Sequence, residues 1–192
     1  MQYEQAYSFL IRKLEQELSH DYSYHDVQHT IDVVEAVEKI TESEKLSHEE
    51  TQLLRTAALF HDAGYLQGND DHETLSCTVA REVLPQFEYK THQIEKICQM
   101  IMSTKLPQKP TSLAEEILCD ADLFYLGSDS YFNRAEKLRS EFEATGKLKP
   151  TADWNKLQID FLKKHRFFTL TAVKEMIWNQ ETFQGKACDQ DS

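Results

Sequence analysis

The sequence predicts an all-α fold, a single-domain helical bundle. The 192 residues include only five glycines and four prolines, apolar residues recur at intervals of three and four, and alternating β-branched runs are nearly absent. A mass of 22.4 kDa suits one domain with a sizeable core. We expect this domain to span residues 1–180, with a motif region over 24–126, C-terminal helices over 130–180 and a frayed tail at 181–192.

Apolar stripes and capping residues predict the helices in chain order. The first is expected over residues 3–18 and the second over 24–43. Ser47 and Glu50 form a capping-box pattern that starts the third, which carries an apolar run to His61 and is expected to end at Gly64. The remaining helices are expected over 72–84, from Thr91, from Ser112 through 126, and over 131–142, 154–161 and 169–178.

The net charge limits which partners the protein is expected to bind, and the cysteine content indicates its cellular compartment. The 33 acidic and 21 basic side chains give a net charge of −12, which opposes non-specific binding to nucleic acid or anionic lipid. No apolar run is long enough to span a membrane. The cysteines show no short paired spacing, so we expect reduced thiols, most of them buried, in a cytoplasmic protein. They are Cys77, Cys98, Cys119 and Cys188.

The pair His61-Asp62 stands at the end of an apolar helical run. Ionisable groups in such a place are destabilising unless a hydrogen bond, a charge partner or a metal ion satisfies them. Two further His-Asp steps occur at 20–21 and 25–26, but both lie in a polar, turn-like stretch where water can satisfy them. The context therefore singles out His61-Asp62 as the candidate site.

Two other groups of side chains extend the candidate site. Asp120 and Asp122 interrupt an apolar run, which favours a metal ligand; the alternative is a structural role such as capping a neighbouring helix or pairing with an arginine. His25 and His29 have i, i+4 spacing, which would place both rings on one helix face. Their structural alternative is a solvated helix start.

The chemistry of these side chains indicates a metal site. The candidates are His29, His61, Asp62 and a carboxylate at Asp122 or Asp120. Nitrogen and oxygen ligands without thiolate favour a divalent ion such as Mn, Fe, Mg, Co, Ni or Zn, held with open positions for water and substrate. Such a set suggests hydrolysis.

At this point the sequence resembles the HD-domain metal-dependent phosphohydrolase superfamily, whose pattern of a His, a His-Asp pair and a distant Asp reads here as His29, His61-Asp62 and Asp122. Residues 24–30 look like the Tyr-His-x-x-x-His-Thr start of many members. Residues 57–62 look like their helix-borne pair, and 120–123 like their Asp-x-Asp segment. Residues 161–169 look like one uncharacterised branch, so the resemblance covers most of the chain.

The resemblance implies an HD-type bundle with its metal site in the core. The ligands would be His29, His61, Asp62 and Asp122, with His25 and Asp120 supporting them from behind. Members with two metals carry two further histidines. His72 can be the first, but residues 102–105 read Met-Ser-Thr-Lys where the second is expected, so we expect one divalent ion. Nucleotidase-like members carry a Glu where this chain has Tyr65.

The function implied is hydrolysis of a phosphate ester or phosphoanhydride of a nucleotide or related small molecule, by attack of an activated water. Asp62 would orient that water, and His72 would act as general acid or contact the substrate. Lys105 and Arg166 would neutralise phosphate charge; a loop histidine and solvated cations are the structural alternatives for these three. His165 and the neighbouring lysines are expected at a solvated helix end.

Two readings of other classes remain open. One is a non-catalytic sensor module that binds a metal or a nucleotide without turnover. The other is a di-iron HD-type oxygenase, which predicts two metal ions and is disfavoured by the missing second histidine. The sequence leaves open whether a hydrolase of this kind would be a phosphomonoesterase, a phosphodiesterase or a pyrophosphohydrolase, and it does not give the oligomeric state.

Overall fold

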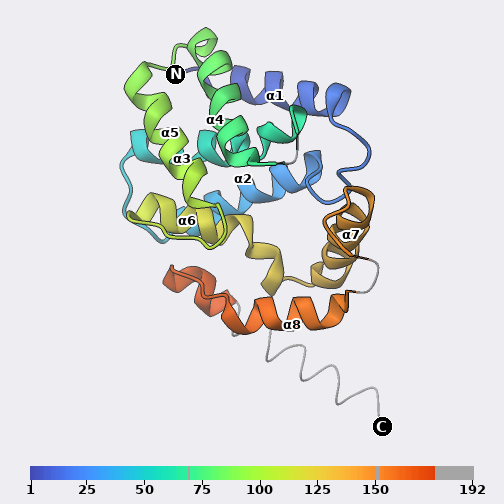
Figure 1. Ribbon diagram of the computed structural model, residues 1–192. Helices are drawn as coiled ribbons and strands as arrows, with labels where there is room; N and C mark the ends of the chain where they lie inside the picture. The colour runs from blue at the N-terminus through green and yellow to red at the C-terminus, as the bar shows by residue number, and fades with distance from the viewer. Residues whose placement is uncertain (69, 150–151, 176–192) are drawn as a thin grey trace.

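The fold is all-helical over the residues that the computed structural model describes, 1–68, 70–149 and 152–175 (Figure 1). The all-α prediction is confirmed. The α-helices are α1 (Tyr3–Glu17), α2 (Val27–Thr41), α3 (His48–Phe60), α4 (His72–Val83), α5 (Thr91–Ser103), α6 (Leu113–Asp122), α7 (Tyr131–Ala144) and α8 (Trp154–Lys164). Short 3-10 turns η1 (Ala63–Leu66), η2 (Leu84–Phe87) and η3 (Phe124–Gly127) follow α3, α4 and α6. Residues 170–175 are also helical.

Helix α3 lies at the centre of the packing. It contacts α2, α5 and α6, and α4 packs on α5 and on η1. The most deeply buried side chains come from these helices and from α1, and they include Leu10, Leu54, Phe60, Ile97, Ile101 and Leu118. Helices α7 and α8 lie at one end of this bundle, beyond α6 (Figure 1). The predicted tail at 181–192 and the last part of the helix expected over 169–178 fall outside the described residues.

The predicted caps form to different extents. Ser47 Oγ accepts from the Glu50 backbone at 3.2 Å, and Glu50 Oε2 accepts from the Ser47 backbone at 2.9 Å, so this capping box is complete. Ser112 Oγ accepts from the Glu115 backbone at 3.4 Å, but the Glu115 carboxylate accepts from the backbone of Thr111 at 2.6 Å. The second box is therefore only half formed.

The second helix begins at Val27, later than predicted, because Asp26 caps it. The Asp26 side chain accepts from the His29 backbone at 2.7 Å, and its own backbone is extended. His25 consequently lies before the helix, and the prediction that it shares a helix face with His29 is wrong. The two rings meet edge to face instead, with centroids 5.7 Å apart.

Gly64 has a packing role that differs from the predicted helix end. Helix α3 already ends at Phe60, and Gly64 lies in the turn η1. A Cβ on Gly64 would lie 2.1 Å from the backbone oxygen of His72, and its N–H donates to Ser76 Oγ at 2.8 Å. The missing side chain therefore lets the turn that follows the His-Asp pair lie directly against α4.

Helix α6 is shorter than predicted. It ends at Asp122, and the turn η3 takes the place of its expected continuation to 126. Cys77, Cys98 and Cys119 are buried free thiols, as expected, while Cys188 lies outside the described residues. Among the described helices, none combines the length and the apolar character needed to cross a bilayer.

Candidate metal centre

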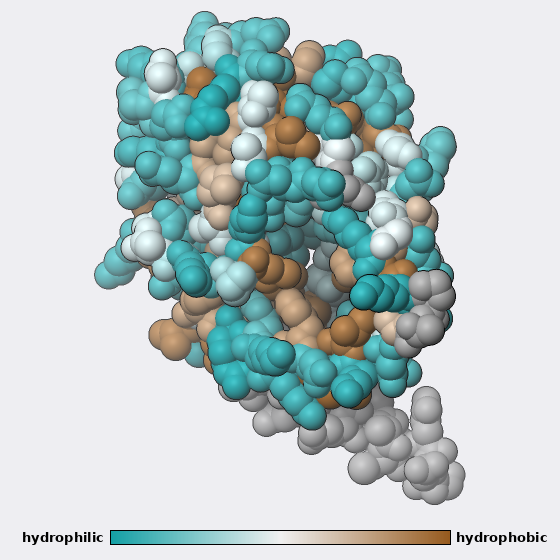
Figure 2. All heavy atoms as spheres, in the orientation of Figure 1, coloured by the Kyte–Doolittle hydropathy of each residue, from teal (hydrophilic) through white to brown (hydrophobic). Residues whose placement is uncertain are grey.

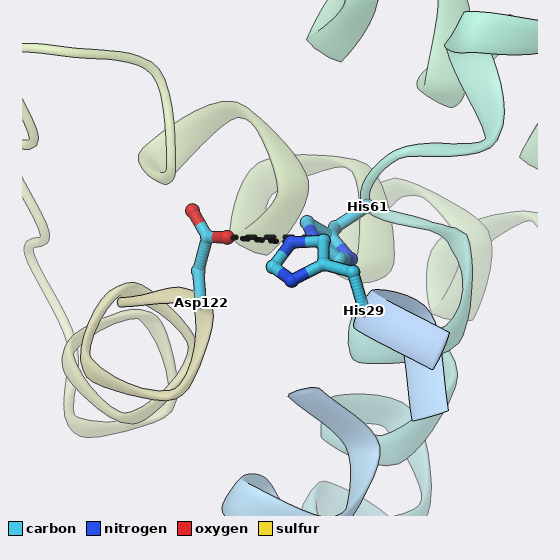
Figure 3. Close-up of side chains that lie close together, drawn as sticks. All are labelled: His29, His61 and Asp122. Atoms are coloured by element: carbon cyan, nitrogen blue, oxygen red, sulfur yellow. Dashed lines mark hydrogen bonds and ion pairs between the residues drawn. The ribbon is translucent and has the colours of Figure 1, made fainter. Parts of the chain in front are cut away.

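Three separate helices bring the predicted donors together. His29 lies in the first turn of α2, His61 and Asp62 directly follow α3, and Asp122 is the last residue of α6. His29, His61 and Asp62 are buried, and Asp122 is partly buried. Figure 3 shows His29, His61 and Asp122 pointing toward one another from their elements. Each of these elements therefore presents its donor at a helix end, where the chain can turn into the core.

The donor atoms converge on a small volume. His29 Nε2 lies 3.4 Å from His61 Nε2, 3.3 Å from Asp62 Oδ2 and 3.3 Å from Asp122 Oδ1. His61 Nε2 lies 3.1 Å from Asp62 Oδ2 and 3.5 Å from Asp122 Oδ1. Ligands about 2.1 Å from one ion are about 3.0 Å apart at right angles and about 3.4 Å apart in a tetrahedron. The observed spacings fit ligands of one ion.

The surroundings of the donors also fit a metal ion. Asp62 Oδ2 is buried and accepts no hydrogen bond, as expected for an oxygen whose partner is a cation. His61 Nδ1 contacts the Ala58 carbonyl at 2.7 Å, and by donating there it fixes the ring with Nε2 toward the other donors. His29, His61 and Asp122 form a group that can hold a divalent metal ion.

Charge coupling dominates the titration of this cluster. Burial alone would lower the pKa of His61, but the charge of Asp62 and the hydrogen bond to Asp122 raise it well above 6.5. The pKa of His29 is raised by the same two carboxylates against the effect of its burial. Burial would raise the pKa of Asp122, yet the two histidines lower it. The cluster therefore holds paired charges when no metal is bound.

A cluster of rings borders the donors on one side. His25 stacks on Tyr65 at 4.3 Å between centroids, and His72 stacks on Tyr65 at 4.5 Å. His72 Nε2 lies 3.5 Å from Asp62 Oδ1, and burial lowers the His72 pKa. The structure thus brings His25 and His72 beside the donors, and Tyr65 links them.

Helix α7 supplies two charged groups that sequence reasoning missed. The buried Glu141 accepts from the backbones of Tyr24 at 2.9 Å and His25 at 3.0 Å, and its other oxygen bonds His25 Nδ1. The buried Arg134 pairs with Asp26 and Asp32 at the start of α2. These contacts hold the segment that leads into His29. These two residues are distinguished from other charged residues only by their burial. The sequence gives no sign of that burial, because charged residues are common on a polar helix.

Asp120 holds the C-terminal part of the chain. Its carboxylate accepts from the backbones of Phe168 at 3.0 Å and Thr169 at 2.7 Å, and from Thr169 Oγ1 at 2.8 Å. Thr169 in turn caps the helical residues that follow, through the Ala172 backbone at 3.2 Å. Asp120 thus takes the structural role that the sequence left open, two residues before the donor Asp122.

The two predicted phosphate-binding cations have partners within the chain. Lys105 is exposed and pairs with Asp71, the residue before His72. Arg166 is exposed and donates to the carbonyl oxygens of Lys163 at 2.9 Å and His165 at 2.6 Å. Neither pairing includes a donor of the cluster, and the role in phosphate binding stays a prediction for both.

A cavity of about 360 Å³ opens beside the donors. Its walls come from α2, the end of α6, η3 and α7, and the same face in Figure 2 is hollowed between η3 and α7. Its volume is within the range of small-molecule sites. The lining includes His29, Asp122, Tyr125, Ser128, Ser130 and Arg134.

The sequence and the fold are similar to those of known proteins. The family model of the HD domain matches residues 26–125. The solved structure of a predicted HD superfamily hydrolase from an uncultured Thermotogales bacterium is 21% identical with a TM-score of 0.58, over 84% of this chain and 89% of that chain. A Listeria innocua protein of solved structure is 19% identical with a TM-score of 0.62, over 96% of this chain and 95% of that chain. A search of curated proteins gave no match.

The two solved structures, at these identities, show a shared fold. The family match carries more weight, because it covers more than half of the 192 residues and includes all four converging donors. The resemblance inferred from the motifs is thereby confirmed. This chain belongs to the HD-domain family.

Proposed function

We propose that this protein is a metal-dependent phosphohydrolase. Its substrate would be a phosphate ester or phosphoanhydride of a nucleotide or a related small molecule. The observation that carries the proposal is the convergence of four nitrogen and oxygen donors beside a cavity of about 360 Å³. The similar Thermotogales protein bears the name of a predicted HD superfamily hydrolase, which supports the same class.

His29, His61, Asp62 and Asp122 would hold one divalent ion. When bound, such an ion polarises a phosphoryl oxygen and lowers the pKa of a coordinated water. The donor set contains no thiolate, which favours Mn, Fe, Mg, Co, Ni or Zn. Asp122 and His29 also line the cavity, so a substrate in the cavity would have its reacting group next to the donors.

Asp62 and His72 are the proposed catalytic residues. Asp62 Oδ2 lies among the donors, while Asp62 Oδ1 lies 3.5 Å from His72 Nε2. The carboxylate can therefore orient a water between the metal site and the histidine. Because burial lowers its pKa, the neutral His72 ring can accept a hydrogen bond from that water. His72 would then pass the proton toward the leaving group.

The test combines metal content with turnover. Wild type, His61→Ala and Asp122→Ala are analysed for bound metal and for release of phosphate and pyrophosphate from a nucleotide panel. His92→Ala is the matched control, because His92 is an exposed histidine on α5. We expect one metal ion and turnover in wild type and control, and loss of both in the two donor variants.

Other outcomes of this test would favour one of the alternative functions. Tight metal binding without turnover on any phosphorylated compound would contradict the hydrolase and leave a sensor module. Two iron ions with an optical absorption band would indicate an oxygenase. Wild type without metal affinity would show that the four side chains are only satisfied core groups.

A further inference from the structure

Arg134 is a buried cation in the wall of the cavity that the donors His29 and Asp122 also line. Only 7% of its side-chain surface is exposed. Its guanidinium pairs through Nη2 with Asp32, and Asp32 lines the same cavity. The charged end of Arg134 therefore lies at the cavity wall, although the residue belongs to a helix whose other faces are largely polar and exposed.

The position of the guanidinium relative to the donors is set by the start of α2. Asp26 Oδ1 accepts from the His29 backbone at 2.7 Å and lies 3.5 Å from Arg134 Nη1, so the two groups share one carboxylate oxygen. Asp32 follows His29 by three residues and lies on the same face of α2. Both partners of Arg134 thus stand within one helical turn of His29, which holds the guanidinium beside this donor.

The guanidinium has more donors than the chain uses. An arginine carries five N–H groups in a rigid planar fork. Within the part of the chain that the structure describes, Arg134 makes one bond to Asp32 and one to Asp26, and the second is long for a hydrogen bond. The other N–H groups can bind a ligand in the cavity, and an anionic acceptor gives the strongest bonds to them.

The charges around Arg134 are balanced, in contrast to those of the whole chain. Lys137 bonds the other oxygen of Asp26 at 2.9 Å, so two cations face two carboxylates at this place. The net charge of the chain is −12, which repels anions at long range. Among the described residues that line the cavity, Arg134 is the one lysine or arginine. It is therefore the side chain there that is suited to hold an anionic group of a ligand.

We propose that Arg134 selects a substrate with two phosphates, one that reacts at the metal centre and a second that binds the guanidinium in the same cavity. The guanidinium fork matches the oxygens of a phosphate and can bind two of them at once. The cavity of about 360 Å³ is in the size range of small-molecule sites. The assignment rests on the proposed function, which supplies the reacting phosphate, and it adds a requirement on the rest of the substrate.

The test compares molecules that carry one phosphate with molecules that carry two. The probes are the monophosphates and bisphosphates of ethylene glycol, propanediol and butanediol, which vary the distance between the phosphates. Their affinities are measured by calorimetry on Mn²⁺-loaded wild type, Arg134→Gln and Arg134→Lys, after removal of excess metal. Lys137→Gln is the matched control, because Lys137 also pairs with Asp26 but is not among the described residues that line this cavity.

We expect at least one bisphosphate to bind the wild type about tenfold more tightly than its monophosphate. Arg134→Gln should lose this advantage, and Arg134→Lys should lose most of it, because lysine keeps the charge without the fork. Lys137→Gln should keep it. A purely structural role of Arg134 would lower both affinities alike and leave their ratio unchanged. If the glutamine variant does not fold, the ratio in Arg134→Lys decides the test.

Two results would overturn the assignment: no advantage of any bisphosphate over its monophosphate in the wild type, or an advantage that persists in the folded Arg134 variants. The outcome for the hydrolase is separate, because it is measured as phosphate release from a nucleotide panel. If the advantage depends on Arg134 but no compound is hydrolysed, the contact stands and the proposed reaction fails. If nucleotides are hydrolysed while bisphosphates and monophosphates bind equally, the reaction stands and the contact fails.

Discussion

The two parts of the molecule on either side of η3 are built by different forces. From α1 to α6 the helices bury apolar side chains; in α3 these run from Leu53 to Phe60 and end at the donor His61. Helix α7 buries Arg134, Ala135 and Glu141, and α8 buries Trp154. The first part brings the donors of the candidate metal centre together by hydrophobic packing, and α7 adds buried charged groups to their surroundings.

The two parts of the molecule therefore contribute to the candidate site in different ways. Apolar burial is non-directional, so it brings helix ends together but does not orient each side chain. Hydrogen bonds to buried carboxylates are directional and fix the segments around the donors. Glu141 holds the backbone of His25, and Asp120 holds Phe168 and Thr169. Substitutions in the two parts should therefore differ in how they affect stability and the segments around the donors.

The largest effect is expected for Gly64→Ala in the first part. The new methyl group would lie 2.1 Å from the His72 backbone oxygen and 2.7 Å from the Ser76 backbone nitrogen, so η1 and α4 must separate. We expect the free energy of unfolding to fall by more than about 3 kcal/mol in a urea titration. Gly146→Ala is the control in the second part. It has open space and a φ of +73°, so its loss should be about 1 kcal/mol. Equal losses would contradict the close packing.

A smaller loss is expected for Glu141→Ala. It leaves the buried N–H of Tyr24 and the partly buried N–H of His25 without their acceptor, which should cost about 2–3 kcal/mol and loosen the approach to His29. Glu143→Ala on the same helix removes only an exposed pair with Arg139 and should change stability by less than about 0.5 kcal/mol. Hydrogen exchange of Tyr24 and His25 should rise only in the first variant. Protection that stays unchanged would show that α7 does not hold this segment.

The smallest effect, counted for each proton, is the pH dependence of metal binding by the donors, which tests the charges of the cluster and not its packing. Burial would lower the pKa values of His29 and His61, but Asp62 and Asp122 raise both, so each ring keeps its proton to a higher pH than a free imidazole when no metal is bound. Metal binding must displace these protons. Affinity should rise with pH by up to about tenfold per unit for each proton displaced, or about 1.4 kcal/mol.

The folding stability of the metal-free protein should change with pH in the opposite direction. The contribution of raised histidine pKa values to stability is fully present below the unfolded value near 6.5 and is lost as pH rises through the higher folded values.

For metal binding, calorimetry in two buffers of different ionisation enthalpy would count the protons that the metal ion releases. Metal binding without proton release would contradict the charge pairing in the cluster.

The donors were predictable from the sequence, and much of their surroundings was not. His61 and Asp62 follow an apolar run, and a polar pair in that place is a local signal that needs no knowledge of the fold. Glu141 and Arg134 lie on a polar helix where charges are ordinary, and their partners are more than 100 residues away. His165 stands between Lys164 and Arg166, and these charges favoured a solvated end, although Phe161 and Phe167, which pack on its ring, are close in the sequence.

The errors in helix boundaries have local causes. Tyr24 continues the apolar spacing of α2, so periodicity extended the helix backward across Asp26, which is in fact its cap. Beyond Asp122 the apolar residues continue through Leu126, but the chain changes to a 3-10 turn there. In both places the apolar pattern correctly predicted that the residues are buried, but wrongly predicted that they are helical. Periodicity alone does not separate the two.

The bond between Glu141 and Tyr24 joins residues 117 positions apart, and it has a consequence for the order of assembly. The chain is synthesised from its N-terminus, so Asp122 has been added before α7 exists. A nascent chain that has only reached Asp122 contains every donor of the metal centre, but the N–H groups of Tyr24 and His25 still lack their acceptor. The surroundings of the centre are therefore completed late, when α7 folds back onto the start of α2.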